Sequence, residues 1–385
     1  MRCEITPTFL RMTTPRITKL KLLAISVLLV PVLVAVAEIA VRVFSKRIDP
    51  LAVFVASPQL RADTQGETTA GMFEFDPLLC WRLKANLRDI WWDFTTVTTN
   101  AQHLRMDRDV GAKRGIRIVV LGDSVTFGYR VPVVHERDKT HLITDSFAIP
   151  YPSLLRESLR EKFPGLEIEV LPLACPGYTS GQGLAWLQRD IVSLAPDIVL
   201  ACFGWNDVRS AGLPDRATMP AGSSQIFVRG IISHSQLLLH IADSAQRRVS
   251  AIVSGAQPEP RSSEEEYVAH FLEMNRVCAG KNAWFGILLP VYRDANTAGI
   301  DPAEPDAAGD SAEGERMARY RAKLRDAAKE NHIEALEIPE LTEASWPANK
   351  KLFGERIHPN AMGHHLIAER LTEFLKTPVS RLKSK

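Results

Sequence analysis

The sequence predicts an α/β fold in which a five-stranded parallel sheet carries helices on both faces. Between residues 116 and 376, five short apolar runs alternate with five longer segments of helical character. Runs made almost entirely of Val, Ile and Leu are typical of parallel strands that are buried on both faces. Regular alternation with helices is the pattern of βαβ units. We therefore expect a three-layer α/β/α sandwich with the flavodoxin-like strand order 2-1-3-4-5.

The elements follow from these patterns in chain order. Strands are expected at residues 117–121, 167–173, 197–203, 283–289 and 333–338, and helices at residues 151–163, 181–193, 263–279, 313–330 and 360–376. Two stretches, 130–149 and 211–225, show neither pattern and are expected to be loops at the carboxyl edge of the sheet. Loops at such an edge commonly set substrate specificity.

Four short motifs each follow a separate core element. The first strand ends directly before Ser124, and Gly177 follows the second strand in a Pro-Gly-Tyr motif. Asn206 follows the third strand, and His358 lies just before the last helix. Ligands of open α/β sheets bind at the carboxyl ends of the strands, so these groups are expected to converge there. A nucleophile, a base and donors for an oxyanion are the set that acyl transfer requires.

With these motifs the chain resembles the SGNH/GDSL hydrolase family, whose four sequence blocks contain Ser, Gly, Asn and His in this order. The match covers roughly residues 116–375. The resemblance implies that Ser124 attacks an ester carbonyl and that His358 accepts its proton. It also implies that the N–H groups of Ser124 and Gly177 and the amide of Asn206 bind the oxyanion. No phosphate-binding loop is present in the sequence, and no cofactor is expected.

One position departs from the family pattern. The family orients its histidine with an aspartate three positions earlier, where this chain has Glu355. Because the positive end of a helix disfavours an imidazolium at His358, a carboxylate partner is chemically expected, and glutamate serves in related triads. We predict Glu355 as the third catalytic residue, with a solvated loop acid as the alternative. Asp123 is expected to fix the serine turn, and Asp207 to cap the turn after Asn206.

An apolar run near the N-terminus predicts a membrane anchor. Residues 22–41 are long enough to cross the hydrocarbon core of a bilayer, with Glu38 near one interface. Basic residues predominate before the run, so the positive-inside rule places the N-terminus in the cytoplasm and the remaining chain outside. Residues 35–37 also resemble a signal-peptidase site, which leaves a cleaved signal as an alternative. A buried core helix is the third reading.

The chain is expected to divide into five parts. They are a cytoplasmic tail (1–21), a transmembrane signal anchor (22–44), a membrane-proximal segment (45–115), the hydrolase-like domain (116–376) and a basic tail (377–385). The membrane-proximal segment resembles, more loosely, that of bacterial membrane-anchored family members. Its Trp91 and Trp92 are expected to pack against the main domain, and stacking on a sugar or lying at the bilayer interface are the alternatives.

Composition excludes some classes of function. A net charge of +2, without a basic stripe interleaved with aromatics, gives no support for nucleic-acid binding. No spacing of His, Cys and carboxylates matches a zinc or calcium site. Five cysteines do not form a disulfide framework. Cys175 and Cys202 would lie two strands apart, beyond disulfide reach, whereas pairing of Cys80 with Cys278 stays open.

The sequence therefore predicts a single-pass serine esterase with an extracytoplasmic domain. The expected substrate is an O-acyl group, such as acetyl, on an envelope polysaccharide or peptidoglycan. Acyl transfer to another sugar is the alternative within the same chemistry. An alternative of another class is a catalytically silent carbohydrate-binding or assembly protein. The intact Ser, Gly, Asn and His argue against that alternative, and Glu355 argues for it.

Overall fold

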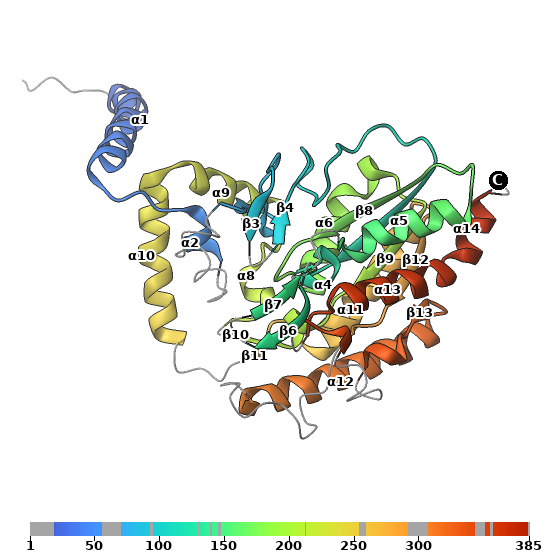
Figure 1. The fold of residues 1–385 in the computed structure, drawn as a ribbon. Helices are drawn as coiled ribbons and strands as arrows, with labels where there is room; N and C mark the ends of the chain where they lie inside the picture. The colour runs from blue at the N-terminus through green and yellow to red at the C-terminus, as the bar shows by residue number, and fades with distance from the viewer. Residues whose placement is uncertain are drawn as a thin grey trace, which may run out of the picture.

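The centre of the molecule is a five-stranded parallel sheet (Figure 1). The computed structural model describes residues 19–55, 71–92, 95–129, 131, 133–138, 141–144, 148–211, 213–253, 259–291, 307–342, 351–354 and 357–383. The strands of the sheet are β5 (Ile116–Gly122), β8 (Ile168–Ala174), β9 (Ile198–Cys202), β12 (Trp284–Leu288) and β13 (Glu334–Leu336). Their order is β13-β12-β9-β5-β8, with every neighbouring pair parallel. This confirms the predicted 2-1-3-4-5 order.

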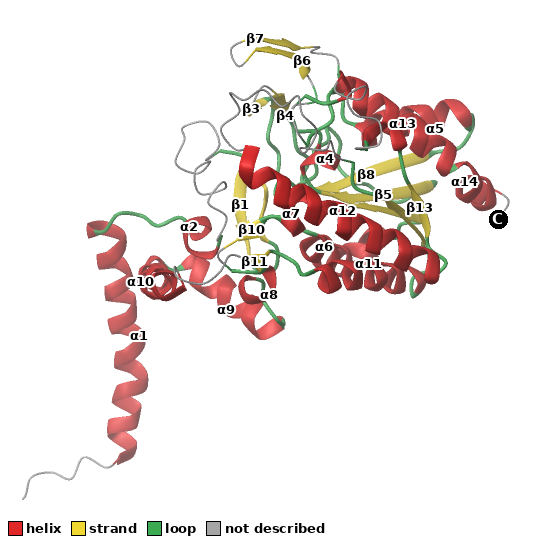
Figure 2. Cartoon of the chain, turned by 90° about the horizontal axis from the view of Figure 1, so that it is seen from below, coloured by secondary structure: helices red, strands yellow, loops and turns green. Residues whose placement is uncertain are grey.

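Helices cover both faces of the sheet (Figure 2). One face carries α6 (Ser180–Leu194), α11 (Glu264–Ala279) and α12 (Ala307–Glu330), and the other carries α5 (Tyr151–Lys162), α13 (Ala361–Phe374) and α14 (Lys376–Lys383). Successive side chains of a strand point to opposite faces. Val119 of β5 therefore joins the first apolar cluster, and Ile118 joins the second. Burying one such side chain contributes on the order of 1.5–3 kcal/mol, so the continuous apolar runs specify the three layers.

Local capping sets where two of these helices begin. The side chain of Thr179 accepts from the backbone N–H of Gln182, and the side chain of Gln182 accepts from the N–H of Thr179, which forms a capping box at the start of α6. Ser263 and Glu266 form the same device at the start of α11. Short helical turns follow three of the strands: α4 (Ser124–Phe127) after β5, α7 (Trp205–Val208) after β9 and the 3-10 turn η1 (Pro339–Leu341) after β13.

The segment before the sheet forms two antiparallel hairpins that share the core of the sheet. They are β1 (Phe73–Asp76) with β2 (Cys80–Leu83), and β3 (Ile90–Trp92) with β4 (Thr95–Val97). Trp81 and Trp92 are buried in the same apolar cluster as Val119. Trp92 thus packs against the main domain, whereas Trp91 is 57% exposed.

The two predicted loops contain regular structure, so that expectation was wrong. Within residues 130–149, β6 (Val133–Asp138) and β7 (His141–Thr144) form an antiparallel hairpin. Within residues 211–225 lies α8 (Asp215–Thr218), and α9 (Ser223–His234) begins there and is followed by α10 (Gln236–Val253). At the start of this stretch β10 (Ser210–Ala211) pairs with β11 (Glu259–Pro260). The helix α9 has no buried residue, and its apolar side chains Phe227, Val228 and Ile231 are exposed.

The N-terminal helix α1 (Lys19–Phe44) stands apart from the core. Its segment Val27–Phe44 has a mean hydropathy of 2.4 and none of it is buried. By length and composition this segment could cross a membrane. A core helix would bury its apolar side chains, so the exposure contradicts the core-helix reading. The short helix α2 (Pro50–Phe54) follows, and the carboxylate of Asp49 caps its first turn.

The described cysteines Cys80, Cys175, Cys202 and Cys278 are all buried and free. The pairing of Cys80 with Cys278, which the sequence left open, is therefore not formed. Cys175 and Cys202 are unpaired, as their places on the sheet predict. Buried free cysteine behaves as a small apolar side chain.

Candidate active site

Ser124 lies at the start of α4, in a turn that we call the nucleophile loop (residues 122–129). A Cβ at Gly122 would lie 1.8 Å from Oγ1 of Thr126, so only glycine lets β5 pass directly into α4. The Asp123 carboxylate accepts from the N–H of Val125 at 2.9 Å and caps the turn, as predicted for Asp123. Gly128, with φ at 83°, ends it. Ser124 is thus held half-buried at the carboxyl edge of the sheet.

His358 faces the serine. Its Nε2 lies 2.7 Å from Oγ of Ser124, across a sequence separation of 234 residues. The imidazole packs against the ring of Tyr129, with 4.5 Å between centroids. The backbone carbonyl of His358 accepts from the N–H of Gly354 at 3.0 Å. The structure therefore brings together a hydroxyl and an imidazole in the geometry that proton transfer between them requires.

The orienting acid cannot be placed in the same way. Glu355 lies outside the residues that the structure describes, so its predicted contact with His358 stays a prediction. Among the described carboxyls, Asp123 is one on which the charge of His358 acts. Burial raises the pKa of Asp123 to about 6, against the opposing effects of its bond to Val125 and the nearby charge of His358.

Gly177 lies in a second turn, which we call the oxyanion loop (residues 175–179). Its φ of 84° is in the left-handed region that favours glycine. Among the described residues, no acceptor is found for the N–H of Gly177. The loop is held beside the nucleophile loop, because the N–H of Cys175 donates to the carbonyl of Gly122 at 3.3 Å. The N–H of Gly177 is thus available to a ligand at this edge.

Asn206 joins the two loops. It lies in α7, directly after β9, and is 8% exposed. Its Nδ2 donates to the carbonyl of Tyr178 at 3.0 Å and lies 3.5 Å from Oδ2 of Asp123. The second contact is too long to be a strong hydrogen bond. One hydrogen of the amide thus fixes the side chain on the carbonyl of Tyr178, and the contact with Asp123 places the amide between the two loops.

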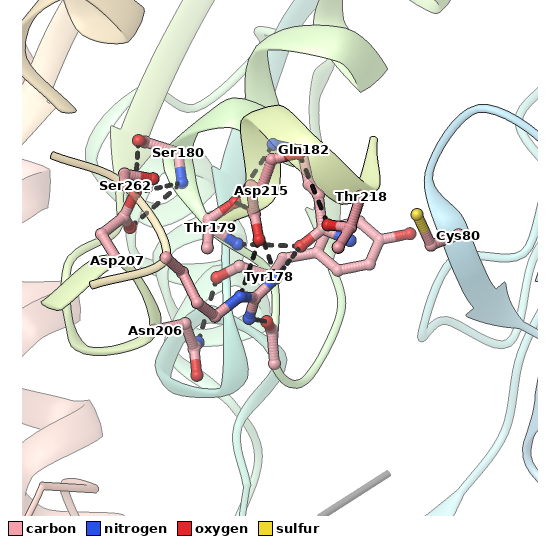
Figure 3. A network of polar contacts seen from close by, with 12 residues as sticks. Cys80, Tyr178, Thr179, Ser180, Gln182, Asn206, Asp207, Asp215, Thr218 and Ser262 are labelled. Carbon is pink, nitrogen blue, oxygen red and sulfur yellow. Dashed lines mark hydrogen bonds and ion pairs between the residues drawn. The ribbon is translucent and has the colours of Figure 1, made fainter. Parts of the chain in front are cut away.

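The oxyanion loop is fastened by residues that the motifs did not reveal (Figure 3). Arg261 donates from Nη1 to the carbonyl of Gly177 at 2.6 Å, and from Nη2 to the side chain of Gln182 at 2.9 Å. Its Nε pairs with Asp215 at 2.9 Å. Asp215 in turn accepts from the hydroxyl of Thr179 at 2.5 Å. Arg261 belongs to no recognisable sequence pattern, so nothing in the chain marked it.

A second polar group fixes the neighbour of Asn206. Asp207 is fully buried and accepts from the N–H and hydroxyl of Ser180 and from the hydroxyl of Ser262 at 2.8 Å. It thus ties α7 to the start of α6, whereas the sequence predicted that it caps its own turn. The sequence did not reveal these contacts of Asp207, because the donors Ser180 and Ser262 come from distant segments. Burial raises the pKa of Asp207 to about 7.

The hairpins before the sheet complete the surroundings of the site. Nε1 of Trp81 donates to the carbonyl of Pro176 at 3.1 Å, and the hydroxyl of Tyr178 donates to the carbonyl of Trp81. Arg105 donates to the carbonyls of Phe127 and Gly128, both at 2.8 Å. Each loop is therefore held by a side chain from residues 71–105.

The site combines a serine hydroxyl, an imidazole, and backbone and amide donors at the edge of a parallel sheet. This combination defines the class of α/β hydrolases with a serine centre. Within the described residues, no group of three His, Cys, Asp or Glu side chains is arranged to hold a metal ion.

The family is shown by its sequence model. Residues 120–366 match the GDSL-like Lipase/Acylhydrolase family, and the chain belongs to that family. An arylesterase of Vibrio mimicus is 34% identical over 91 residues, which are 24% of this chain and 38% of that relative. The chain therefore matches less than half the length of this curated relative.

Three solved structures are similar at low identity. The hydrolase LAE5 from the metagenome of Lake Arreo has a TM-score of 0.42 at 20% identity, over 70% of this chain and 96% of its own. A lipase/acylhydrolase from Enterococcus faecalis has a TM-score of 0.41 at 14% identity, over 68% and 96%. The acetylxylan esterase Axe2 of Geobacillus stearothermophilus has a TM-score of 0.41 at 17% identity, over 69% and 94%.

Proposed function

We propose that the protein is a membrane-anchored serine esterase whose catalytic domain lies outside the cytoplasm. The observation that carries the catalytic part is the 2.7 Å contact between Oγ of Ser124 and Nε2 of His358. Membership of the GDSL-like family supports it. The apolar exposed segment of α1 and the basic residues before it support the anchor and its orientation.

In the proposed mechanism His358 takes the proton of Ser124 while Oγ attacks the ester carbonyl. The carbonyl oxygen becomes an oxyanion, which the N–H groups of Ser124 and Gly177 and the amide of Asn206 stabilise. His358 then returns the proton to the leaving alcohol, and an acyl-enzyme remains. Water, deprotonated by the same imidazole, releases the acyl group and restores the serine. Glu355 is proposed to orient His358.

The proposed substrate class is an O-acylated glycan of the cell envelope. The orientation of the anchor would expose the domain to such polymers. The exposed Trp91 stands beside Trp92, which contacts Tyr129 at 5.1 Å between centroids, and Tyr129 contacts His358. As an exposed aromatic ring on the β3–β4 hairpin, Trp91 suits a sugar ring.

The chemistry is tested on the full chain in detergent with a fluorophosphonate probe and with aryl acetates. We expect labelling at Ser124 and hydrolysis of the acetates, both lost in Ser124→Ala. A well-folded protein that shows neither would refute the esterase and leave a silent module. Comparing acetate released from an acetylated glycan with acetate moved to an added sugar separates hydrolysis from transfer.

The topology is tested by a C-terminal reporter that is active only outside the cytoplasm. We expect an active reporter and a full-length protein that stays with membranes after alkaline washing. A soluble product that begins at Glu38 would establish a cleaved signal instead. An inactive reporter would refute the orientation.

A further inference from the structure

We infer that α9 is an interfacial helix, with Phe227, Val228 and Ile231 resting in the lipid surface of the bilayer that α1 crosses. The inference rests on the proposed membrane anchor. It concerns a region that takes no part in the proposed chemistry.

The first observation is the exposed face of α9. Phe227 is 69% exposed, Val228 is 50% exposed and Ile231 is 48% exposed. Their spacing of one and three residues places them on one side of the helix. Beyond α1, the other large apolar side chains that are exposed in the described structure lie singly, at Trp91, Val192, Ile241 and Met362. The cluster on α9 therefore stands out, because scattered single residues are ordinary and grouped ones are not.

The opposite face of α9 is fastened to α2, to the turn between β1 and β2, and to α8. Arg229 donates to the carbonyl of Pro77 at 3.3 Å and to the carbonyl of Thr218 at 3.0 Å. Its guanidinium lies over the ring of Phe54, 5.0 Å from the centroid. These contacts fix the rotation of the helix, so the apolar face is held outward.

The second observation is the bond between α9 and α1. The carboxylate of Glu38 accepts from the N–H groups of Gln236 and Leu237, both at 2.9 Å, and from the hydroxyl of Ser235 at 2.7 Å. It thereby caps the start of α10. Arg42 donates to the carbonyl of His234, the last residue of α9, at 2.9 Å. The carboxyl end of α9 is thus one hydrogen bond away from the proposed membrane helix.

The place of these bonds along α1 sets the depth of α9. Glu38 precedes the end of α1 at Phe44 by six residues, which is about 9 Å of helix. Arg42 lies closer still to that end. The bonds therefore join α9 to the part of α1 that lies at the boundary between hydrocarbon and headgroups. Lys46 and Arg47 follow α1, are exposed, and suit anionic headgroups.

The arrangement of the helices agrees with a position of α9 at the bilayer surface. α10 runs along the page in Figure 1, where α1 is foreshortened, and is seen end-on in Figure 2, where α1 lies along the page. α10 therefore runs across α1, as a helix does that lies parallel to a bilayer. In Figure 2, α8 and α9 are on the side of the domain toward which α1 extends, and α4, which begins with Ser124, is on the far side.

The occupant of the apolar face is thus a phospholipid surface, not another protein. A helix with an apolar face beside a membrane span meets lipid before any soluble partner. It follows that the catalytic edge faces away from the anchoring bilayer, so the ester substrate reaches Ser124 from the aqueous side.

The test uses the full chain in nanodiscs of phosphatidylcholine and phosphatidylglycerol, in a Cys3→Ser background. The described native cysteines are buried, so single cysteines at Phe227, Ile231, Val30 and Glu330 can carry a nitroxide. Val30 is the reference within α1, and Glu330 is an exposed control at the end of α12. Collision with oxygen and with a water-soluble nickel chelate is measured by electron paramagnetic resonance. Turnover of an aryl acetate confirms folding of each variant.

We expect labels at Phe227 and Ile231 to resemble Val30, with high oxygen and low nickel accessibility, while Glu330 shows the reverse. If both α9 labels resemble Glu330 while Val30 is in lipid, the inference is wrong and the anchor stands. If the α9 labels are shielded from both oxygen and the nickel chelate, protein covers the apolar face of α9. This result would also overturn the inference. A nickel-accessible Val30 would refute the anchor itself.

Discussion

The nucleophile loop and the oxyanion loop meet at one edge of the sheet but are built in different ways. The nucleophile loop is closed mainly by its own residues, since the carboxylate of Asp123 binds the N–H of Val125 and the carbonyl of Ser124 accepts from Gly128. The oxyanion loop is held by distant side chains, with Trp81 95 residues away and Arg261 84 residues away from the carbonyls that they bind. The conformation of the nucleophile loop is therefore set by its own residues. The conformation of the oxyanion loop depends on distant segments, whose sequences can vary independently of it.

The largest effect should come from the histidine that serves the nucleophile loop. If Glu355 orients His358, Glu355→Gln should lower turnover by up to about 10⁴-fold, because an amide cannot stabilise the imidazolium. Glu355→Asp should keep substantial activity. Aryl-acetate kinetics measure both, with the exposed Glu369→Gln as the matched control. Turnover of Glu355→Gln above about a third of the wild-type value, a loss below roughly 0.7 kcal/mol, would make Glu355 a bystander.

The next effect tests the residue that joins the two loops. Asn206→Ala should lower kcat by roughly 10²–10³-fold, the usual cost of one lost oxyanion donor. KM should change little, because the amide acts on charge that develops only in the transition state. Asn331→Ala, at an exposed position after α12, is the control. An unchanged kcat would show that the amide does not face the oxyanion.

A smaller effect should come from the distant support of the oxyanion loop. Arg261→Met removes the donor to the carbonyl of Gly177 and leaves Asp215 without its cation. We expect kcat to fall about tenfold, or ~1.4 kcal/mol, with KM retained and with partial rescue in Arg261→Lys. The control is Arg276→Met, which replaces an exposed arginine on α11 and should change neither kcat nor KM. A lower thermal stability with normal kcat would mean that Arg261 is structural only.

The smallest effect concerns the pH dependence of stability. Burial raises the pKa of Asp207 to about 7 in the folded protein, from an ordinary value of 3.8. A carboxyl with a raised pKa binds its proton more tightly in the folded state, so it stabilises at low pH and this contribution is lost as pH rises through about 7. Between about pH 4 and about pH 7, Asp207→Asn should therefore lose less thermal stability than the wild type.

The matched control is Asp326→Asn, which is exposed and should follow the wild type. Parallel melting curves for all three proteins across this range would contradict the raised pKa.

The same contrast explains what could be predicted from sequence. The five strands were found because burial on both faces leaves continuous apolar runs, as in β5. Ser124, Gly177, Asn206 and His358 stand in short motifs at the ends of these elements, and the structure places them at one edge. Their catalytic roles remain predictions, as does that of Glu355.

The residues that were missed share a physical cause. Arg261 and Asp215 act through contacts across long sequence separations, which leave no local pattern. The helix α9 buries none of its residues, so it makes no contribution to the core from which the other helices were predicted. The hairpin β6–β7 carries charged residues between its apolar ends, which hides the alternation of a strand.

The cap that Glu38 provides for α10 has a consequence for the order of synthesis. Glu38 and Gln236 are 198 residues apart, which a ribosome covers in about 10 to 40 s. In the proposed topology, the anchor therefore enters the membrane before α10, which Glu38 caps, has been made. The newly made α10 therefore docks on a carboxylate that is already at the membrane surface, before β12, β13 and His358 have been made.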